Sequence, residues 1–191
     1  MRLYLELLRH GETELGGGLR GSLDDALTET GWAQLRAAVA DGSRWDRVIS
    51  SPLQRCARFA EELAAQHGLP LSLEPDLQEL HFGAWEGCNT AELMQTSAAE
   101  LGRFWSDPYG FTPPEGEPLL AFEARILSAL QRLQERHAGE RLLLVTHGGV
   151  IRLLLARARG LPRNDLLQVQ VAHAQRFQLG LDEQGQLWEQ V

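Results

Sequence analysis

Two motifs with reactive side chains lie far apart in this chain: Arg9-His10-Gly11 near its beginning and His147-Gly148-Gly149 more than a hundred residues later. A neutral imidazole, whose reference pKa is about 6.5, is a competent nucleophile at neutral pH. An arginine beside it can donate two parallel hydrogen bonds to phosphate oxygens. The two histidines together predict an active site for an anionic substrate, whereas either one alone could equally be a strand-end residue with a structural hydrogen bond.

Each motif directly follows an apolar run that predicts a buried strand, Leu3–Leu8 before the first and Arg141–Thr146 before the second. In open α/β sheets, ligands bind at the carboxyl ends of the strands. If these two strands are neighbours, their ends bring His10 and His147 together. Gly11 lacks a Cβ, so the backbone can turn sharply there and approach a ligand closely.

A third strand end carries further cations. The predicted strand Asp46–Ser50 precedes a helix in which Ser51 is the expected N-cap and Pro52 the first helical residue. Arg55 and Arg58 lie one turn apart near the start of this helix, where anions are already favoured. Such arginines are also common on solvated helix faces, so the phosphate-binding interpretation depends on the neighbouring strand ends.

Two glutamates, Glu79 and Glu86, are candidates for a general acid. They lie in a segment, residues 77–87, that has neither helix nor strand periodicity and mixes carboxylates with apolar and aromatic side chains. Desolvation beside Leu80, Phe82 and Trp85 could keep one carboxyl group protonated, as a general acid requires. Alternatively, both are surface glutamates on a loop that the aromatic residues anchor.

The remaining pattern indicates an α/β fold in which most strands are separated by helices. A four-glycine loop at 14–21 either borders the site or is a plain flexible connection. Further elements are predicted from periodicity and capping residues: a helix from Thr28 towards Gly42, one or two short helices within 89–105, helices over Leu119–His137 and Val150–Arg159, and strands at 177–181 and 187–188.

Composition limits the possible functions. A chain of 191 residues predicts one domain, with an insertion at about 89–118 that covers the site. A net charge of -8 argues against a nucleic-acid partner but not against a small basic pocket. Cys56 and Cys88 are expected to be free thiols, and no residue spacing suggests a metal or another cofactor. No stretch is long enough to span a membrane, so we expect a soluble, cytoplasmic protein. No feature indicates an oligomeric state.

The other histidines are less informative. His67 and His137 lie near predicted helix ends, where a cation is mildly favoured, and are interpreted as structural. His81 and His173 receive no role from the sequence.

Five motifs in order resemble the histidine phosphatase superfamily, which includes the cofactor-dependent phosphoglycerate mutases. They are Leu-Arg-His-Gly-Glu-Thr at 8–13, Leu-Thr-Glu-Thr-Gly at 27–31, Ser-Ser-Pro-Leu-Gln-Arg at 50–55, Glu-Leu-His-Phe-Gly-Ala-Trp-Glu-Gly at 79–87 and Thr-His-Gly-Gly-Val-Ile-Arg at 146–152. The resemblance implies a three-layer α/β/α sandwich, phosphoglycerate mutase-like, with a mostly parallel central sheet.

The resemblance also implies roles for individual residues. His10 would take the phosphoryl group as a phosphohistidine, and Glu79 would protonate the leaving oxygen and then activate water. The phosphoryl oxygens and the substrate would be bound by a set of residues drawn from the motifs and the glycine loop: Arg9, Arg20, Gly21, Arg55, His147 and Gly148. Preorganised cations of this kind stabilise the charge of a phosphoryl-transfer transition state without a metal.

The chain departs from the family pattern at Leu15-Gly16, where members often carry Trp-Asn. Gly16 has no side chain to donate to phosphate, so that contact is either lost or made by backbone amides of the glycine loop.

The short chain and the Phe-Gly-x-Trp-Glu segment look most similar to the small phosphatases of this family, including those that act on α-ribazole 5'-phosphate in cobalamin biosynthesis. The substrate would then be a small phosphomonoester. The alternatives are a broad-specificity metabolite phosphatase, a phosphoglycerate mutase and a phosphate-binding module without turnover.

Overall fold

The central strands of the protein are buried on both faces. In the computed structural model, which describes residues 1–190, Leu142 and Leu144 of β4 (Arg141–Thr146) pack into one hydrophobic cluster, and Leu143 and Val145 pack into another. Near-continuous apolar runs are typical of strands that are covered by helices on both sides. The apolar runs singled out in the sequence therefore form the middle of the sheet.

The sheet has six strands in the order β3-β2-β4-β1-β5-β6. β1 (Leu3–Arg9) and β4 are parallel neighbours, and β2 and β3 continue the parallel part; β5 is antiparallel to both β1 and β6. The other four strands span Arg47–Ser50 (β2), Leu71–Leu73 (β3), Arg176–Leu181 (β5) and Leu187–Glu189 (β6). The mostly parallel sheet and the two terminal strands are confirmed.

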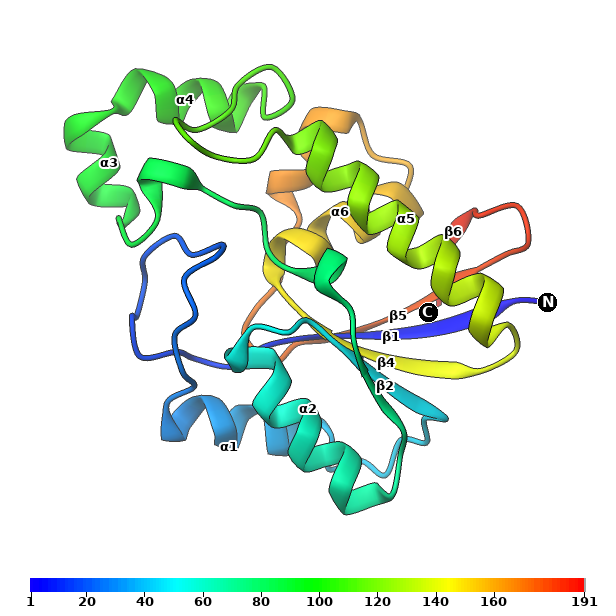
Figure 1. Ribbon diagram of the computed structural model, residues 1–191. Helices are drawn as coiled ribbons and strands as arrows, with labels where there is room; N and C mark the ends of the chain where they lie inside the picture. Colours follow the sequence, from blue (N-terminus) through cyan, green and yellow to red (C-terminus); the bar gives the residue numbers. More distant parts are fainter. Residues whose placement is uncertain (191) are drawn as a thin grey trace.

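Helices cover both faces of this sheet. α1 (Glu29–Ala38) and α2 (Gln54–His67) lie on one side, and α5 (Leu119–His137) and α6 (Gly148–Ala158) lie on the other (Figure 1). The predicted apolar stripe of α5 is buried, including Phe122, Ile126 and Leu130. The expected three-layer α/β/α sandwich is confirmed.

The segment predicted to be an insertion contains two short helices, α3 (Thr90–Thr96) and α4 (Ala98–Ser106), in agreement with the helices predicted there. They lie beyond the carboxyl end of the parallel strands (Figure 1). Leu93, Leu101 and Phe104 belong to the same hydrophobic cluster as α5 and α6, so the insertion packs directly on the main core. Single turns of 3-10 helix complete the connections at Pro75–Leu77 (η1) and Gly83–Trp85 (η2), with a longer one at Arg163–Gln168 (η3).

The predicted start of α2 is wrong. This helix begins at Gln54, and Ser51 does not cap it. The Ser51 hydroxyl accepts a hydrogen bond from Nε2 of His147 at 2.8 Å, while the N–H of Gln54 donates to Asp24 Oδ1 at 2.6 Å. A residue from the loop before α1 therefore caps the helix. Thr28 does cap α1, as predicted, but α1 ends at Ala38, before Gly42.

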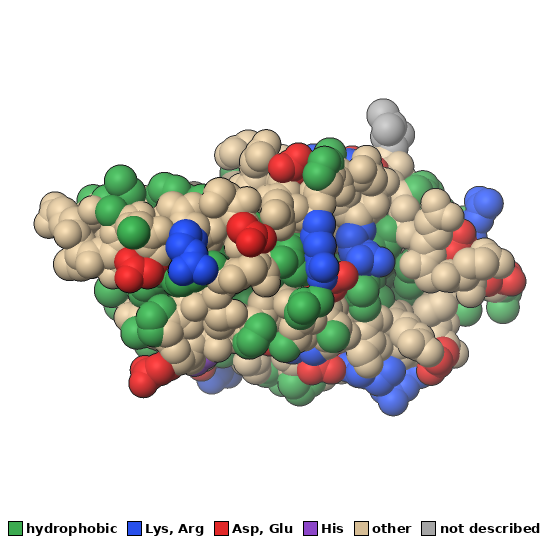
Figure 2. Space-filling view, turned by 90° about the horizontal axis from the view of Figure 1, so that it is seen from above, with side chains coloured by type: hydrophobic (Ala, Val, Ile, Leu, Met, Phe, Trp, Pro, Cys, Tyr) green, Lys and Arg blue, Asp and Glu red, His purple; other side chains and the backbone are tan. Residues whose placement is uncertain are grey.

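No helix among residues 1–190 is both long and apolar enough to cross a membrane. On the face seen from above, basic and acidic side chains are interspersed and do not form a single basic patch (Figure 2). Cys56 and Cys88 are free, and Cys56 is buried.

Candidate active site

The ends of β1 and β4 bring the two histidine motifs together. Arg9 is paired with Thr146 in the parallel register, and the N–H of His10 donates to the carbonyl of Thr146 at 3.0 Å. The ring centroids of His10 and His147 are 5.5 Å apart. The structure thus brings together the two imidazoles that the sequence places more than a hundred residues apart.

His10 is held in one tautomer. Its Nδ1 donates to the carbonyl oxygen of Gly11 at 2.8 Å, because a carbonyl can only accept. Burial lowers the pKa of His10 well below its usual range; the Gly11 carbonyl opposes this, and the charges of Arg55 and Arg9 lower it further. His10 is therefore neutral at pH 7 and carries its lone pair on Nε2, which suits a nucleophile.

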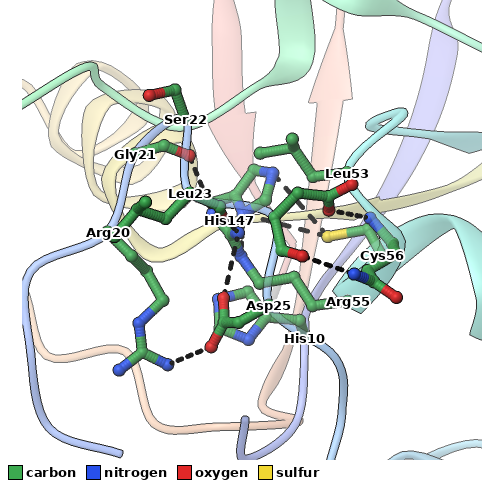
Figure 3. A network of polar contacts seen from close by, with 12 residues as sticks. His10, Arg20, Gly21, Ser22, Leu23, Asp25, Leu53, Arg55, Cys56 and His147 are labelled. Atoms are coloured by element: carbon green, nitrogen blue, oxygen red, sulfur yellow. Dashed lines mark hydrogen bonds and ion pairs between the residues drawn. The ribbon is translucent and has the colours of Figure 1, made fainter. Parts of the chain in front are cut away.

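His147 is fully buried, and its ring lies next to that of His10. Arg55 Nε donates to Nδ1 of His147 at 3.3 Å (Figure 3). The proton of this ring is therefore on Nε2 and is donated to Ser51. Burial lowers the pKa of His147 well below its usual range, and the charges of Arg55 and Arg9 act in the same direction. Cys56 Sγ lies 3.7 Å from Nε2, and burial raises the pKa of this thiol.

Arg55 is fully buried and ties the loop before α1 to α2. It donates to the carbonyl oxygens of Leu23 at 2.6 Å and Gly21 at 3.0 Å, and it pairs with Asp25 at 3.4 Å. Arg55, which was predicted to bind the phosphoryl oxygens, therefore lies beside His147. Most of its hydrogen-bond donors are engaged by this loop. Arg58 is exposed and pairs with Glu61, so it belongs to a solvated helix face.

Arg9 directly precedes His10 in the sequence. Its NH1 donates to the carbonyl of Val171 at 2.6 Å, and its buried Nε has no hydrogen-bond partner among the described residues. Burial lowers the pKa of Arg9 to about 10, while the Glu79 carboxylate opposes this shift and the nearby charge of Arg152 adds to it. The site concentrates positive charge in a protein whose net charge is negative.

Glu79 is fixed by backbone donors. Its Oε1 accepts from the N–H of Leu80 at 2.8 Å and its Oε2 from the N–H of Gly149 at 2.9 Å, in the first turn of α6. Arg125 of α5 donates to the carbonyl oxygens of Glu79 at 2.9 Å and Gln78 at 2.8 Å. Backbone and core contacts therefore set the position of this carboxyl group.

Glu86 has a different environment. Its carboxylate accepts from the backbone N–H groups of Ser22 at 2.8 Å, Leu23 at 2.9 Å and Phe82 at 3.2 Å. Burial alone would raise the pKa of Glu86, but these hydrogen bonds outweigh it and the pKa is lowered. Glu86 is an ionised anchor that joins two loops, and with a side chain only 9% exposed it is not the surface glutamate of the alternative interpretation.

A cavity of about 210 Å³ opens at the end of the sheet. It is lined by Arg9, His10, Gly16, Gly17, Gly18, Leu19, Arg20, Glu79, Phe82, Arg152 and His173. The glycine loop therefore borders the site. Three arginines and one carboxylate line this cavity, so it is suited to binding an anion.

Several predicted residues lie next to the cavity without lining it. A Cβ on Gly148 would lie 3.3 Å from Nε of Arg9, so this glycine lets α6 approach the arginine closely. A Cβ on Gly21 would lie 2.0 Å from the carbonyl oxygen of Leu80, so Gly21 allows the two loops to pack. No residue of the insertion at 89–118 lines this cavity; Phe104 of α4 packs instead against Phe82, with ring centroids 6.3 Å apart.

Sequence reasoning missed two of the lining residues. Arg152 belongs to the last family motif but received no role; its Nε donates to the carbonyl of Val169 at 3.0 Å. His173 lies with its ring centroid 5.7 Å from that of His10, and burial lowers its pKa, as do the charges of Arg9 and Arg20. The motif could have indicated Arg152, whereas no local pattern indicates His173. His67, His81 and His137 do not line the cavity.

Among residues 1–190, no three His, Cys, Asp or Glu side chains are grouped so that they could hold a metal ion.

Comparisons with known proteins agree with this geometry. A sequence profile described as the histidine phosphatase superfamily (branch 1) matches residues 5–191. The adenosylcobalamin/alpha-ribazole phosphatase of Escherichia coli (strain K12) is 34% identical over 166 residues, covering 85% of this chain and 81% of that protein. The structure of the alpha-ribazole phosphatase from Shigella flexneri is 30% identical, has a TM-score of 0.84 and covers 100% of this chain and 95% of its own. Bacillus stearothermophilus YhfR is 28% identical, with a TM-score of 0.89, over 99% of this chain and 96% of its own.

Proposed function

Because the chain belongs to the histidine phosphatase superfamily (branch 1) and is a phosphatase, we propose that it hydrolyses small phosphomonoesters through a phosphohistidine on His10. The observation that carries this proposal is the hydrogen bond from His10 Nδ1 to Gly11, which leaves the Nε2 lone pair free beside an arginine-lined cavity. We further propose that α-ribazole 5'-phosphate of cobalamin biosynthesis is the substrate.

In the first step, the Nε2 lone pair of His10 attacks phosphorus, and the bond between phosphorus and the alcohol oxygen breaks. The electron pair of that bond goes to the alcohol oxygen, which takes a proton from Glu79. Arg9, Arg20 and Arg152 line the cavity and stabilise the charge on the phosphoryl oxygens.

The second step releases phosphate. Glu79, now a carboxylate, accepts a proton from a water molecule while the water oxygen attacks phosphorus. The bond between phosphorus and Nε2 breaks, and its electron pair returns to His10. The hydrogen bonds that Leu80 and Gly149 donate to Glu79 hold its carboxyl group in place for both steps.

His147 and Arg55 have a supporting role next to His10. Arg55 holds His147 as the tautomer protonated on Nε2 and adds positive charge next to His10. We propose that both stabilise the phosphoryl group on His10, since the ring of His147 lies 5.5 Å from that of His10 and Arg55 contacts His147.

The choice of α-ribazole 5'-phosphate is supported by the two phosphatases compared above, whose names carry that substrate and whose lengths nearly match this chain. A broad-specificity phosphatase is the second candidate. It is favoured by one observation: no residue of the segment 89–118, which the sequence predicts to cover the site, lines the cavity.

Phosphate release from a panel of phosphomonoesters tests the proposal. The panel should include α-ribazole 5'-phosphate, 3-phosphoglycerate and an aryl phosphate, each with and without a chelator. We expect a kcat/KM for α-ribazole 5'-phosphate at least tenfold above the others, unchanged by chelator. Similar values across the panel would favour the broad-specificity enzyme, and no release from any substrate would contradict the proposed reaction.

A further inference from the structure

Asp25 is a buried carboxylate shared by two arginines. Its Oδ2 lies 3.1 Å from NH1 of Arg20 and its Oδ1 lies 3.4 Å from NH1 of Arg55, while its side chain is only 4% exposed (Figure 3). Within residues 1–190, neither arginine forms an ion pair with another carboxylate. A buried charge that loses its partner is strongly disfavoured, so Asp25 fixes where both guanidinium groups can lie.

Arg20 in turn holds the glycine loop. Its Nε and NH2 donate to the carbonyl of Gly18 at 3.2 Å and 3.1 Å, and its NH2 also donates to the carbonyl of Gly16. A Cβ at Gly16 or Gly17 would meet nothing within 4 Å, so no close packing fixes this part of the loop. Consecutive glycines lose more conformational entropy on ordering than other residues, and the arginine offsets part of that cost.

The same residues form a wall of the cavity. Arg20 and all three glycines of Gly16–Gly18 line it together with His10. Asp25 also forms an ion pair with Arg55, and Arg55 donates a hydrogen bond to His147. The position of the Asp25 carboxylate therefore determines where Arg20 and the cavity wall Gly16–Gly18 lie. It also determines where Arg55 lies beside His147.

We propose that Asp25 is a positioning residue of the active site: it holds Arg20 and the loop Gly16–Gly18 as the wall that binds the phosphoryl oxygens of the substrate. This proposal rests on the proposed function, because it assigns the phosphoryl group to that wall. Asp25 does not line the cavity and acts through Arg20.

Two physical effects of removing the Asp25 charge have opposite signs. Simple Coulomb attraction predicts tighter phosphate binding, because a negative charge next to an arginine-lined cavity disappears. Loss of positioning predicts weaker binding, because Arg20 and the glycine loop no longer hold the geometry that phosphate requires. A residue with a purely structural role would lower stability without changing phosphate affinity in the folded protein.

The test is the affinity of Asp25→Asn for inorganic phosphate, measured by calorimetry on the full chain. We expect the dissociation constant to rise about tenfold, and KM for an aryl phosphate to rise similarly while kcat changes less than about threefold, as for lost uniform binding. The matched control is Asp24→Asn, the same change one residue earlier. Asp24 is exposed and its asparagine keeps an acceptor oxygen for the N–H of Gln54, so phosphate affinity should stay within about twofold.

Trypsin gives a second readout that is independent of turnover. Arg20 is the one basic residue between Arg9 and Arg36, so cleavage after it reports on the glycine loop. We expect faster cleavage at this bond in Asp25→Asn than in the wild type or Asp24→Asn, with inorganic phosphate protecting the wild type most.

A variant of the other partner covers the case in which Asp25→Asn does not fold. Arg20→Gln should weaken phosphate binding to a similar extent, and the effects of the two substitutions should not add in the double variant, because both remove one ion pair. Unchanged or tighter phosphate binding in folded Asp25→Asn, or in folded Arg20→Gln, would overturn the proposal. Wild-type protein that binds phosphate but hydrolyses no phosphomonoester would instead refute the proposed function. The ratio of the phosphate dissociation constants of Asp25→Asn and the wild type would still test the role of Asp25.

Discussion

Glu79 and Gly149 are in direct contact: Oε2 of Glu79 accepts a hydrogen bond from the N–H of Gly149 at 2.9 Å, and a Cβ on Gly149 would lie 2.2 Å from Oε1. The start of α6 therefore determines where the carboxyl group lies. Because α6 begins directly after β4, the strand that delivers His147 also positions the candidate acid.

Gly149→Ala should displace Glu79 and lower activity without removing any reactive group. A displacement of about 1 Å in an active site can cost on the order of a hundredfold in rate, so we expect a loss of that order in kcat for a sugar phosphate. The control is Gly102→Ala in α4, where a Cβ would meet nothing within 4 Å and activity should not change. Equal activities for the two variants in a steady-state assay would contradict the role of this contact.

Glu79→Gln should affect substrates according to their leaving groups. A ribose alkoxide needs a proton and a nitrophenolate needs it far less, so the first step should slow about a hundred- to ten-thousand-fold with a sugar phosphate but much less with an aryl phosphate. Burst kinetics separate this step from the release of phosphate, which should slow with both substrates. Glu86→Gln is the comparison, since Glu86 binds loop amides and does not line the cavity. Equal losses of the first step for both substrates in Glu79→Gln would mean that another group is the acid.

The strand ends were predictable from sequence because their determinants are local. Apart from Glu6 and Thr146, the buried positions of the runs before His10 and His147 are apolar, as is typical of a central strand that is covered on both faces. The fold class follows from the order of these elements.

Other features depend on contacts that no local pattern contains. Ser51 has the sequence features of an N-cap, but its hydroxyl accepts a hydrogen bond from His147, and Asp24 caps α2 instead. His173 reaches the cavity because residues 169–175 run beside the end of β1, where the N–H of Arg9 donates to the carbonyl of Gln175. Such pairings are set by the tertiary fold, so no local sequence pattern assigns a role to His173.

The pKa of His10 predicts how stability depends on pH. Its folded-state pKa lies well below the value of about 6.5 expected in the unfolded chain, so below that pH the unfolded state binds a proton that the folded state does not. The free energy of unfolding therefore falls as the pH decreases. One such histidine therefore contributes to the loss of stability between pH about 7.5 and 5.5, the range around its unfolded-state pKa.

His10→Asn should remove that contribution, so its stability should fall less than that of the wild type between the two pH values. Urea denaturation at each pH measures the difference. His67→Asn, a substitution at an exposed position at the end of α2, should retain the full wild-type loss. The same pH dependence in His10→Asn as in the wild type would show that His10 is not held neutral by the fold.

The most direct test of the mechanism is to find the residue that carries the phosphoryl group. Glu79→Gln should accumulate the intermediate from an aryl phosphate, whose first step this substitution slows least. Alkaline quenching during turnover of that substrate, labelled with radioactive phosphorus, preserves phosphohistidine. Trypsin then separates the three histidines near the cavity into peptides 10–20, 142–152 and 164–176, each of which contains a single histidine. The account predicts label on peptide 10–20, which contains His10. Label on the peptide of His147 or His173, or no labelled peptide during active turnover, would contradict it.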